Sequence, residues 1–288
     1  MTTTQIGLSN RPRSLMEWSR SLRAVRRLIV PALTALLTAS SLTLCGSALA
    51  AEVRVMCSGG FAAALRELTP EFERETHNSI IISWGPSMGS TNDAIPVRLS
   101  RGETADVLIM VRTALDQLAE RHALVPDSEV DLALSKVGLA VRSGAPRPDI
   151  RTVDALRHVL LDARSIAYSD SASGVYVSTE LFRKLGIADQ LKAKSRMIPG
   201  EPVGAVIARG DAEIGFQQIS ELLAVKGVDV IGPIPDEVQS ITVFSAGISQ
   251  FGSAPDAARK FIEFLSSPRA EAAIERSGLV TARSGSAK

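Results

Sequence analysis

The sequence predicts an α/β fold in which mostly parallel sheets are flanked by helices. Three short apolar segments, at 52–57, 80–84 and 105–111, are typical of buried parallel strands. Segments with helix-like composition and spacing of apolar residues follow them. The same alternation resumes in the second half of the chain, so we expect two α/β units.

The first strand leads through a tight loop, Ser58-Gly59-Gly60, into an amphipathic helix at 61–76. Pro70 lies inside this helix and is expected to kink it or divide it in two. The strand at 80–84 stops at Gly85-Pro86. The elements predicted next are a small hydroxylated loop at 87–91, a short helix at 94–100, the strand at 105–111 and a helix at 113–122.

A strand at 136–141 and an extended turn at 143–148 mark the approach to the second unit. The elements predicted there are helices at 152–161, 175–185 and 202–209, and strands at 165–168, 194–198, 213–216 and 228–231. A long apolar strand at 240–248 can carry the chain back, and the closing elements are helices at 254–265 and 269–277.

The N-terminal segment has the pattern of a secretory signal peptide, at 1–50. Four arginines within 20–27 precede an apolar run at 28–44, and small residues suit cleavage after Ala50. Lipid anchoring at Cys45 is not expected, because Leu44 is too bulky for the usual lipoprotein signal. We therefore expect a periplasmic protein.

The net charge and the numbers of cysteine and histidine residues exclude several classes of partner and ligand. The predicted signal carries six arginines and one acidic residue, so its removal changes the net charge from +1 to −4. A mildly acidic chain without a basic block argues against nucleic acid and anionic membrane surfaces as partners. Cys57 is then the one remaining cysteine, which excludes an internal disulfide. The three histidines, at 77, 122 and 158, lack metal-ligand spacing, so we expect neither metal nor cofactor.

Four predicted strand ends share small or hydroxylated residues that open a helix. They are Ser58-Gly59, Ser87-Met88-Gly89-Ser90, Ser171-Ala172-Ser173-Gly174 and Gly200-Glu201-Pro202-Val203. Helix N-termini expose unpaired N–H groups and a positive dipole end, which attract anions. Two of these loops belong to each unit, so together they predict a cleft lined by N–H and O–H donors. Gln217-Gln218, at another strand end, could close it.

The chain resembles the periplasmic molybdate-binding family, the substrate-binding components of ABC importers. The similarity covers roughly 53–280 and rests on CSGGFAAALRELTPEFE, SRGETADVLIM, SASGVYVSTELFRKLG and VIARGDAEIGF, with the closing ARKFIEFLSSPRAEAAIERSG. It implies a Venus flytrap fold: two lobes, each a mostly parallel sheet flanked by helices, joined by two crossover strands. We expect lobe 1 at 51–136 and 242–288, and lobe 2 at 137–241. The expected partners are a small anionic solute and an inner-membrane ABC permease, and the expected state is a monomer.

The resemblance implies a molybdate- or tungstate-like oxyanion, held in the interlobe cleft by neutral hydroxyls and backbone N–H groups. The family contacts carry onto Ser58, onto Ser87 or Ser90, and onto Ala172 or Ser173. The candidate ligand-binding residues are Ser58, Gly59, Ser87, Met88, Ser90, Thr91, Ala172, Ser173, Pro202, Val203, Gln218 and Arg112.

Three departures from the family pattern bear on the ligand. The loop at 87–91 is longer than in the family, and Gln218 stands where the family often has a tyrosine. Arg112 follows the third strand, close to the expected mouth of the cleft, and a guanidinium there suits a carboxylate bidentately. A small organic carboxylate anchored by Arg112 is therefore the alternative ligand.

A secreted serine esterase is a more remote alternative. Gly85-Pro86-Ser87-Met88-Gly89 has the G-x-S-x-G spacing of a nucleophile elbow, which would make Ser87 the nucleophile. Such an enzyme needs a histidine late in the chain, but none follows His158. We therefore expect no enzymatic activity and no catalytic residues. Asp106 and Trp84, both at strand ends, are interpreted as an acceptor for strand-end amides and as a core residue.

Overall fold

The computed structural model describes residues 1–3 and 50–285 of the chain. Ala50–Lys288 forms one compact unit. Most of the predicted signal peptide, including Cys45, lies outside the described residues. Within the described segments no helix combines the length and the apolar character that a membrane crossing requires.

The first half of the sheet begins with parallel strands, as predicted. β1 (Glu52–Cys57) lies between β2 (Ser79–Trp84) and β3 (Val107–Val111). The helices that follow these strands are α2 (Ala62–Thr76), α3 (Ile95–Ser100) and α4 (Arg112–Glu120). α2 is continuous, so Pro70 does not divide it, although its ring removes one helical N–H donor.

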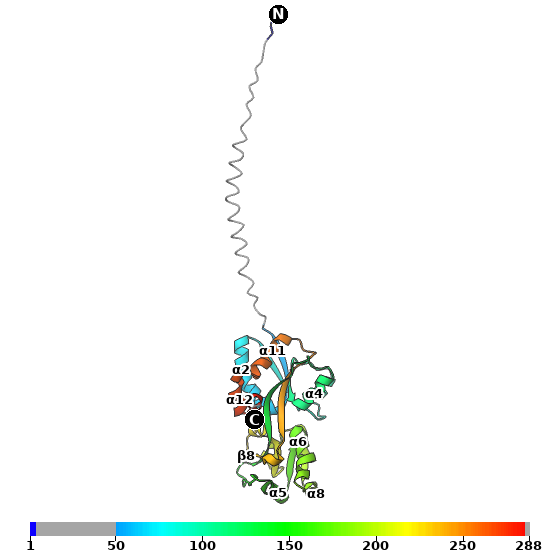
Figure 1. The fold of residues 1–288 in the computed structure, drawn as a ribbon, viewed down its shortest axis with the longest axis vertical. Helices are drawn as coiled ribbons and strands as arrows, with labels where there is room; N and C mark the ends of the chain where they lie inside the picture. The colour runs from blue at the N-terminus through cyan, green and yellow to red at the C-terminus, as the bar shows by residue number, and fades with distance from the viewer. Residues whose placement is uncertain (4–49, 286–288) are drawn as a thin grey trace. The chain divides into compact units, whose positions relative to one another are not determined.

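Two long strands, β4 (Val130–Arg142) and β9 (Ile241–Ile248), connect the two halves of the sheet (Figure 1). β9 is antiparallel to β3 and to residues 130–136 of β4. Residues 137–142 of β4 pair instead with β7 (Ile214–Gln218) and β8 (Val228–Pro233). This arrangement matches the two crossover strands of the expected fold.

The second half of the sheet is parallel in the order β7, β5 (Ile166–Ser169) and β6 (Ser195–Ile198). The helical elements around it are α5 (Val153–Asp162), α6 (Ala172–Tyr176), the π-helical turn η3 (Val177–Leu181), α7 (Phe182–Lys184), α8 (Ala188–Leu191), α9 (Val203–Arg209) and α10 (Ile219–Leu223). The carboxyl ends of β5 and β7 therefore lead directly into α6 and α10.

The hydrophobic core divides along β4. Leu132 and Ala133 pack with β1, β3 and β9, whereas Val137 and Leu139 pack with β5 and β7. The closing helices α11 (Pro255–Leu265) and α12 (Glu271–Arg276) cover the first half. Phe261 packs on Phe72 of α2 with ring centroids 4.7 Å apart. The predicted lobe limits, 51–136 with 242–288 and 137–241, stay a prediction, because contacts join both halves into one unit.

A buried carboxylate joins the segment before α11 to the first strands of the sheet. Asp106, at the start of β3, is 1 % exposed and accepts hydrogen bonds from the backbone N–H groups of Arg54, Ser253 and Ala254. The last two amides lie at the N-terminus of α11, where a negative charge is favourable. The interpretation of Asp106 as an acceptor for backbone amides is confirmed.

Candidate functional site

A pocket of about 260 Å³ lies between residues of the two halves of the sheet. From the first half it is lined by Ser58, Gly59, Trp84, Gly85, Pro86 and Asp93. From the second half it is lined by Ser169, Asp170, Ser171, Gly200, Glu201, Pro202, Gln217 and Glu221. These residues lie at the carboxyl ends of β1, β2, β5, β6 and β7, which is where ligands bind in open α/β sheets.

Helix N-termini from both halves open onto this pocket. Ser58 precedes the short 3₁₀ turn η2 (Gly59–Phe61) that leads into α2, Ser171 precedes α6, and Pro202 precedes α9. The first N–H groups of η2 have no acceptor within the turn, and the positive end of its dipole lies at Ser58 and Gly59, which line the pocket. α9 differs, because Gln217 Oε1 already accepts from the Val203 N–H at 2.9 Å.

Hydroxyl groups add donors to this edge. Ser169 Oγ lies 3.2 Å from Ser171 Oγ and 3.1 Å from Ser173 Oγ. Ser58 is buried, and its hydroxyl has no hydrogen-bond partner among the described residues. Ala172 packs against the core of the first half. Of the predicted residues, Ser58, Gly59 and Pro202 line the pocket, whereas Ala172, Ser173 and Val203 do not; Ser173 lies within hydrogen-bond distance of Ser169, which does.

The loop at 87–91 is placed differently from the prediction. Ser87 is fully buried, and its Oγ accepts from the Val111 N–H at 2.9 Å, so the hydroxyl joins the loop to β3. Met88 and Ser90 do not line the pocket. Thr91 approaches Gly200 of the second half, and its buried Oγ1 has no partner among the described residues. None of these four candidates lines the pocket, although Thr91 lies beside Gly200, which does.

The same observations remove the basis for a serine esterase. A nucleophile elbow must expose its hydroxyl, but Ser87 is buried and engaged with the backbone. Cys57 is no better a nucleophile, because burial raises the pKa of its thiol far above the usual range.

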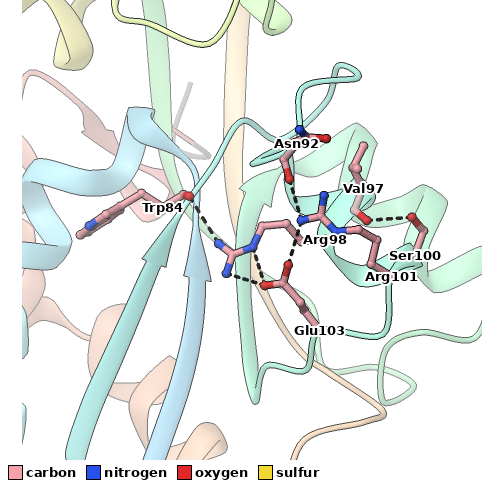
Figure 2. Close-up of polar contacts among 7 residues, drawn as sticks. All are labelled: Trp84, Asn92, Val97, Arg98, Ser100, Arg101 and Glu103. Carbon is pink, nitrogen blue, oxygen red and sulfur yellow. Dashed lines mark hydrogen bonds and ion pairs between the residues drawn. The ribbon is translucent and has the colours of Figure 1, made fainter.

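A cluster of charged residues that the sequence reasoning missed holds the loop between Trp84 and Asp93. Glu103 accepts from Arg98 Nε at 2.8 Å and from Arg101 Nη2 at 2.9 Å. Arg101 also donates to the Asn92 carbonyl at 2.7 Å, and Arg98 Nη1 points at the Trp84 carbonyl 3.5 Å away (Figure 2). The two arginines hold the pKa of Glu103 below its ordinary value. Both ends of the loop are thus tied to one carboxylate.

Arg112 does not serve as the predicted anchor. Its Nε donates to Asp116 at 2.6 Å and its Nη1 to Asp131 at 3.0 Å, and it is not among the residues that line the pocket. These two carboxylates already neutralise the guanidinium and hold its pKa above the ordinary value. The structure therefore does not place Arg112 at this pocket, and the expected cation is engaged by Asp116 and Asp131.

Gln218 is also oriented away from the pocket. Its Nε2 donates to Thr242 Oγ1 at 2.8 Å, and its buried Oε1 has no partner among the described residues. Its backbone lies beside the carboxyl group of Glu221 and lowers the pKa of that group, against the larger effect of burial. The neighbouring Gln217, not Gln218, therefore contributes the side chain that lines the pocket.

Glu221 is the pocket residue that the sequence reasoning missed. Its Oε1 lies against Gly59, where an added Cβ would come within 2.5 Å of it. Burial raises the pKa of Glu221 to about 7; hydrogen bonds from Gln217 and Gln218 act in the opposite direction, and the charge of Asp170 adds to the rise. A carboxyl group half-ionised near neutral pH is suited to accepting and returning protons.

Trp84 lines the pocket and contacts a cation. The Arg66 guanidinium lies 4.4 Å from the centroid of the Trp84 ring, a cation–π contact. Arg66 is exposed, forms no salt bridge within residues 50–285 and does not line the pocket. Trp84 also packs on the first core, as interpreted from the sequence.

The chain matches a known protein family and several characterised relatives. Residues 53–280 match the family described as bacterial extracellular solute-binding protein. A relative from Pseudomonas sp named aconitate isomerase is 48% identical over 253 residues, which covers 88% of this chain and 96% of the relative. The molybdate-binding protein ModA of Azotobacter vinelandii is 24% identical over 245 residues, which covers 81% of this chain and 91% of that protein.

A solved structure agrees on the fold. The periplasmic molybdate-binding protein of Azotobacter vinelandii has a TM-score of 0.63 at 22% identity, covering 79% of this chain and 98% of that one. The resemblance to periplasmic molybdate-binding proteins and the two-lobed α/β fold are therefore confirmed. The expectation of a protein without enzymatic activity is wrong, because a relative that is 48% identical over most of the chain is named as an isomerase.

Proposed function

This chain belongs to the bacterial extracellular solute-binding protein family, and from that premise we propose that it binds aconitate in the pocket between its two halves and isomerises it. The observation that carries the proposal is the 48% identity to the relative named aconitate isomerase, over 88% of this chain and 96% of that protein. As a solute-binding protein of the ABC-transporter type, the chain also implies a small solute and a membrane permease as partners. The monomeric state and the signal peptide at 1–50 stay predictions.

The pocket offers hydrogen-bond donors to an anionic ligand. Ser58, Gly59 and Ser171 line it, and the first N–H groups of η2 have no acceptor within the turn. Hydrogen bonds to charged groups contribute about 1.5–3 kcal/mol each, and micromolar affinity needs about 8 kcal/mol, so a few well-placed donors suffice. Arg66, whose guanidinium lies 4.4 Å from the centroid of the Trp84 ring, is not among the residues that line the pocket.

Aconitate has a carbon–carbon double bond that exists in cis and trans forms. Its interconversion requires that a proton be removed from the CH2 carbon beside the double bond and returned to the other end of the same three-carbon system. The reaction needs a group that accepts and returns a proton, and no net oxidation or reduction occurs. A pocket with a carboxyl group of pKa about 7 meets this requirement.

The purified protein should convert cis-aconitate and trans-aconitate to the same final mixture, whichever isomer is supplied. The vinyl proton of each isomer gives its own resonance, so ¹H NMR follows both directions in one tube. Calorimetric titrations with aconitate and with molybdate separate the two ligand classes represented among the relatives. Absence of conversion, together with tight molybdate binding, would assign the pocket to an inorganic oxyanion.

Intrinsic fluorescence offers a direct reading of ligand binding. Trp84 is the one tryptophan within 50–288, so a Trp18→Phe variant leaves it as the sole reporter in the full chain. Since its ring lines the pocket, aconitate should change its emission saturably, with the affinity found by calorimetry. Trp84→Phe in the same background is the control and should lose the signal. Calorimetric binding without any change in Trp84 emission would place the ligand elsewhere.

A further inference from the structure

The geometry points to Glu221 as the catalytic residue that carries a proton between two carbon atoms of the bound substrate, an inference that rests on the proposed isomerase function. Glu221 lines the pocket from the second half of the sheet, and its Oε1 faces the backbone of Gly59 from the first half. A ligand that bridges Ser58 and Ser171 would therefore lie beside this carboxyl group.

The absence of a side chain at residue 59 makes room for this carboxyl group. An added Cβ at Gly59 would lie 2.5 Å from Glu221 Oε1, which is shorter than any ordinary contact. Gly59 is also the first residue of η2, so its N–H has no acceptor within the turn. Both Gly59 and Glu221 line the pocket, which places an N–H donor and a group that accepts a proton in contact with each other.

Two residues of β7, Gln217 and Gln218, lie beside the Glu221 carboxyl group and favour its charged form. The Val203 N–H donates to Gln217 Oε1 at 2.9 Å, which fixes the orientation of the Gln217 amide. Glu221 is therefore placed next to a side chain whose own position is defined.

The charged groups around Glu221 leave it able to exchange protons near neutral pH. Burial raises the pKa of Glu221 to about 7, and the negative charge of Asp170 contributes to the rise. The other pocket carboxylates are Glu201, which pairs with Arg209, and the exposed Asp93. The pocket lining contains no Lys, Arg or His, so no cation lowers the pKa of Glu221 at close range.

The proposed step balances without a co-reactant. A carboxylate oxygen of Glu221 takes a proton from the CH2 carbon of aconitate, and the C–H electron pair spreads over the three-carbon system and its carboxylates. Glu221, now neutral, returns the proton to the carbon that was vinylic. The double bond thereby moves by one position, and the conformation in which the pocket holds the new vinylic arm decides whether the product is cis or trans.

A purely structural role for Glu221 is the competing explanation. Gln218 precedes α10 and Glu221 is the third residue of that helix, the position from which the carboxylate of a capping box reaches back to the N-cap N–H. Glutamine serves in such caps as well as glutamate does. Glu221→Gln should therefore leave the helix cap intact and separate the two roles.

The test compares the wild-type protein with Glu221→Gln in binding and in turnover. We expect turnover of aconitate to fall by about 100- to 10,000-fold, the usual contribution of a general acid–base group. The dissociation constant, measured by Trp84 fluorescence, should change by less than about tenfold. Glu180→Gln is the matched control: Glu180 is half-exposed, pairs with Lys184 and does not line the pocket, so activity should be unchanged.

The pH profile gives a second readout. Glu221 must be ionised to accept a proton, so kcat/KM of the wild type should rise with pH through about 7. The free energy of unfolding should fall as the pH rises through the same range. Because the folded pKa exceeds the ordinary value of 4.5, stability due to Glu221 is fully present below pH 4.5 and is lost as the pH rises through about 7. Glu221→Gln should abolish both dependences.

Deuterium exchange distinguishes failure of this inference from failure of the proposed function. Wild-type protein in D2O should introduce deuterium into the CH2 group of aconitate, and Glu221→Gln should not. Isomerisation or exchange that persists in Glu221→Gln would overturn the role of Glu221 and leave the proposed function intact. Exchange by the wild type without isomerisation would refute the isomerase and support Glu221. Binding of aconitate with neither exchange nor isomerisation would overturn both.

Discussion

Replacing Asp106 with alanine should lower the free energy of unfolding by about 3–5 kcal/mol, as the change leaves buried amides without acceptors. Asp106 Oδ2 accepts from the Arg54 N–H at 2.7 Å, and Oδ1 accepts from the N–H groups of Ser253 and Ala254 at 2.6 and 2.8 Å. An unsatisfied buried donor costs about 1–3 kcal/mol, and the lost charge at the N-terminus of α11 adds to this. Urea unfolding followed by circular dichroism measures the difference.

Asp149→Ala is the control for this experiment. Asp149 is exposed and its carboxylate pairs with Arg151 two residues away, so its loss should destabilise the protein far less than the loss of Asp106. An Asp106→Ala protein as stable as Asp149→Ala would show that water or a neighbouring group replaces the carboxylate. The tie between β1, β3 and α11 would then not depend on this side chain.

Replacing Gly174 with alanine should lower the free energy of unfolding by at least about 3 kcal/mol. It should also abolish ligand binding beside Ser169, Ser171 and Ser173. A Cβ at residue 174 would lie 1.6 Å from the Ser169 carbonyl oxygen and 2.8 Å from the Ser169 nitrogen, so backbone, not a flexible side chain, must move. That movement would separate Ser169 Oγ from Ser173 Oγ, which lie 3.1 Å apart. Thermal unfolding and the Trp84 titration measure the two effects.

Gly144→Ala separates steric clash from backbone strain. Gly144 has a φ of +82°, and no atom lies within 4 Å of an added Cβ. Alanine there should cost about 1–2 kcal/mol through the left-handed backbone alone, with no effect on ligand binding. If Gly174→Ala costs no more than Gly144→Ala and still binds aconitate, the close approach of α6 to β5 is not required for the site.

The positions of the loops that follow the parallel strands can be inferred from the order of residues in the sequence. Ser58-Gly59 and Ser171-Ala172 each follow an apolar strand and open a helix, and both loops lie at the pocket. A strand of a parallel sheet must direct its carboxyl end to the edge where ligands bind, so the order of apolar and small residues already fixes this placement. Asp106 is also predictable, because a carboxylate at a buried strand end needs donors and backbone amides are the nearest.

Sequence patterns do not predict where a polar side chain points when several partners compete for it. Arg112 stands at the end of β3, but Asp116 one helical turn away and Asp131 on β4 bind it first. Ser87 matches a nucleophile motif, yet its hydroxyl is used by the Val111 amide. Gln217 and Gln218 are adjacent on β7, and strand alternation sends one side chain to the pocket and the other to Thr242.

The sequence by itself determined the α/β order of elements, because hydrophobic periodicity and strand direction are local properties. The two crossover strands followed from the resemblance to the molybdate-binding family. The tertiary structure alone decided the acid–base character of the pocket. Glu221 reads in sequence as a helix-cap residue of α10. Its environment is created by Gly59, more than a hundred residues earlier, and by the burial that raises its pKa to about 7. Proton affinity depends on what surrounds a carboxyl group in space, and that is settled when the two halves of the sheet meet.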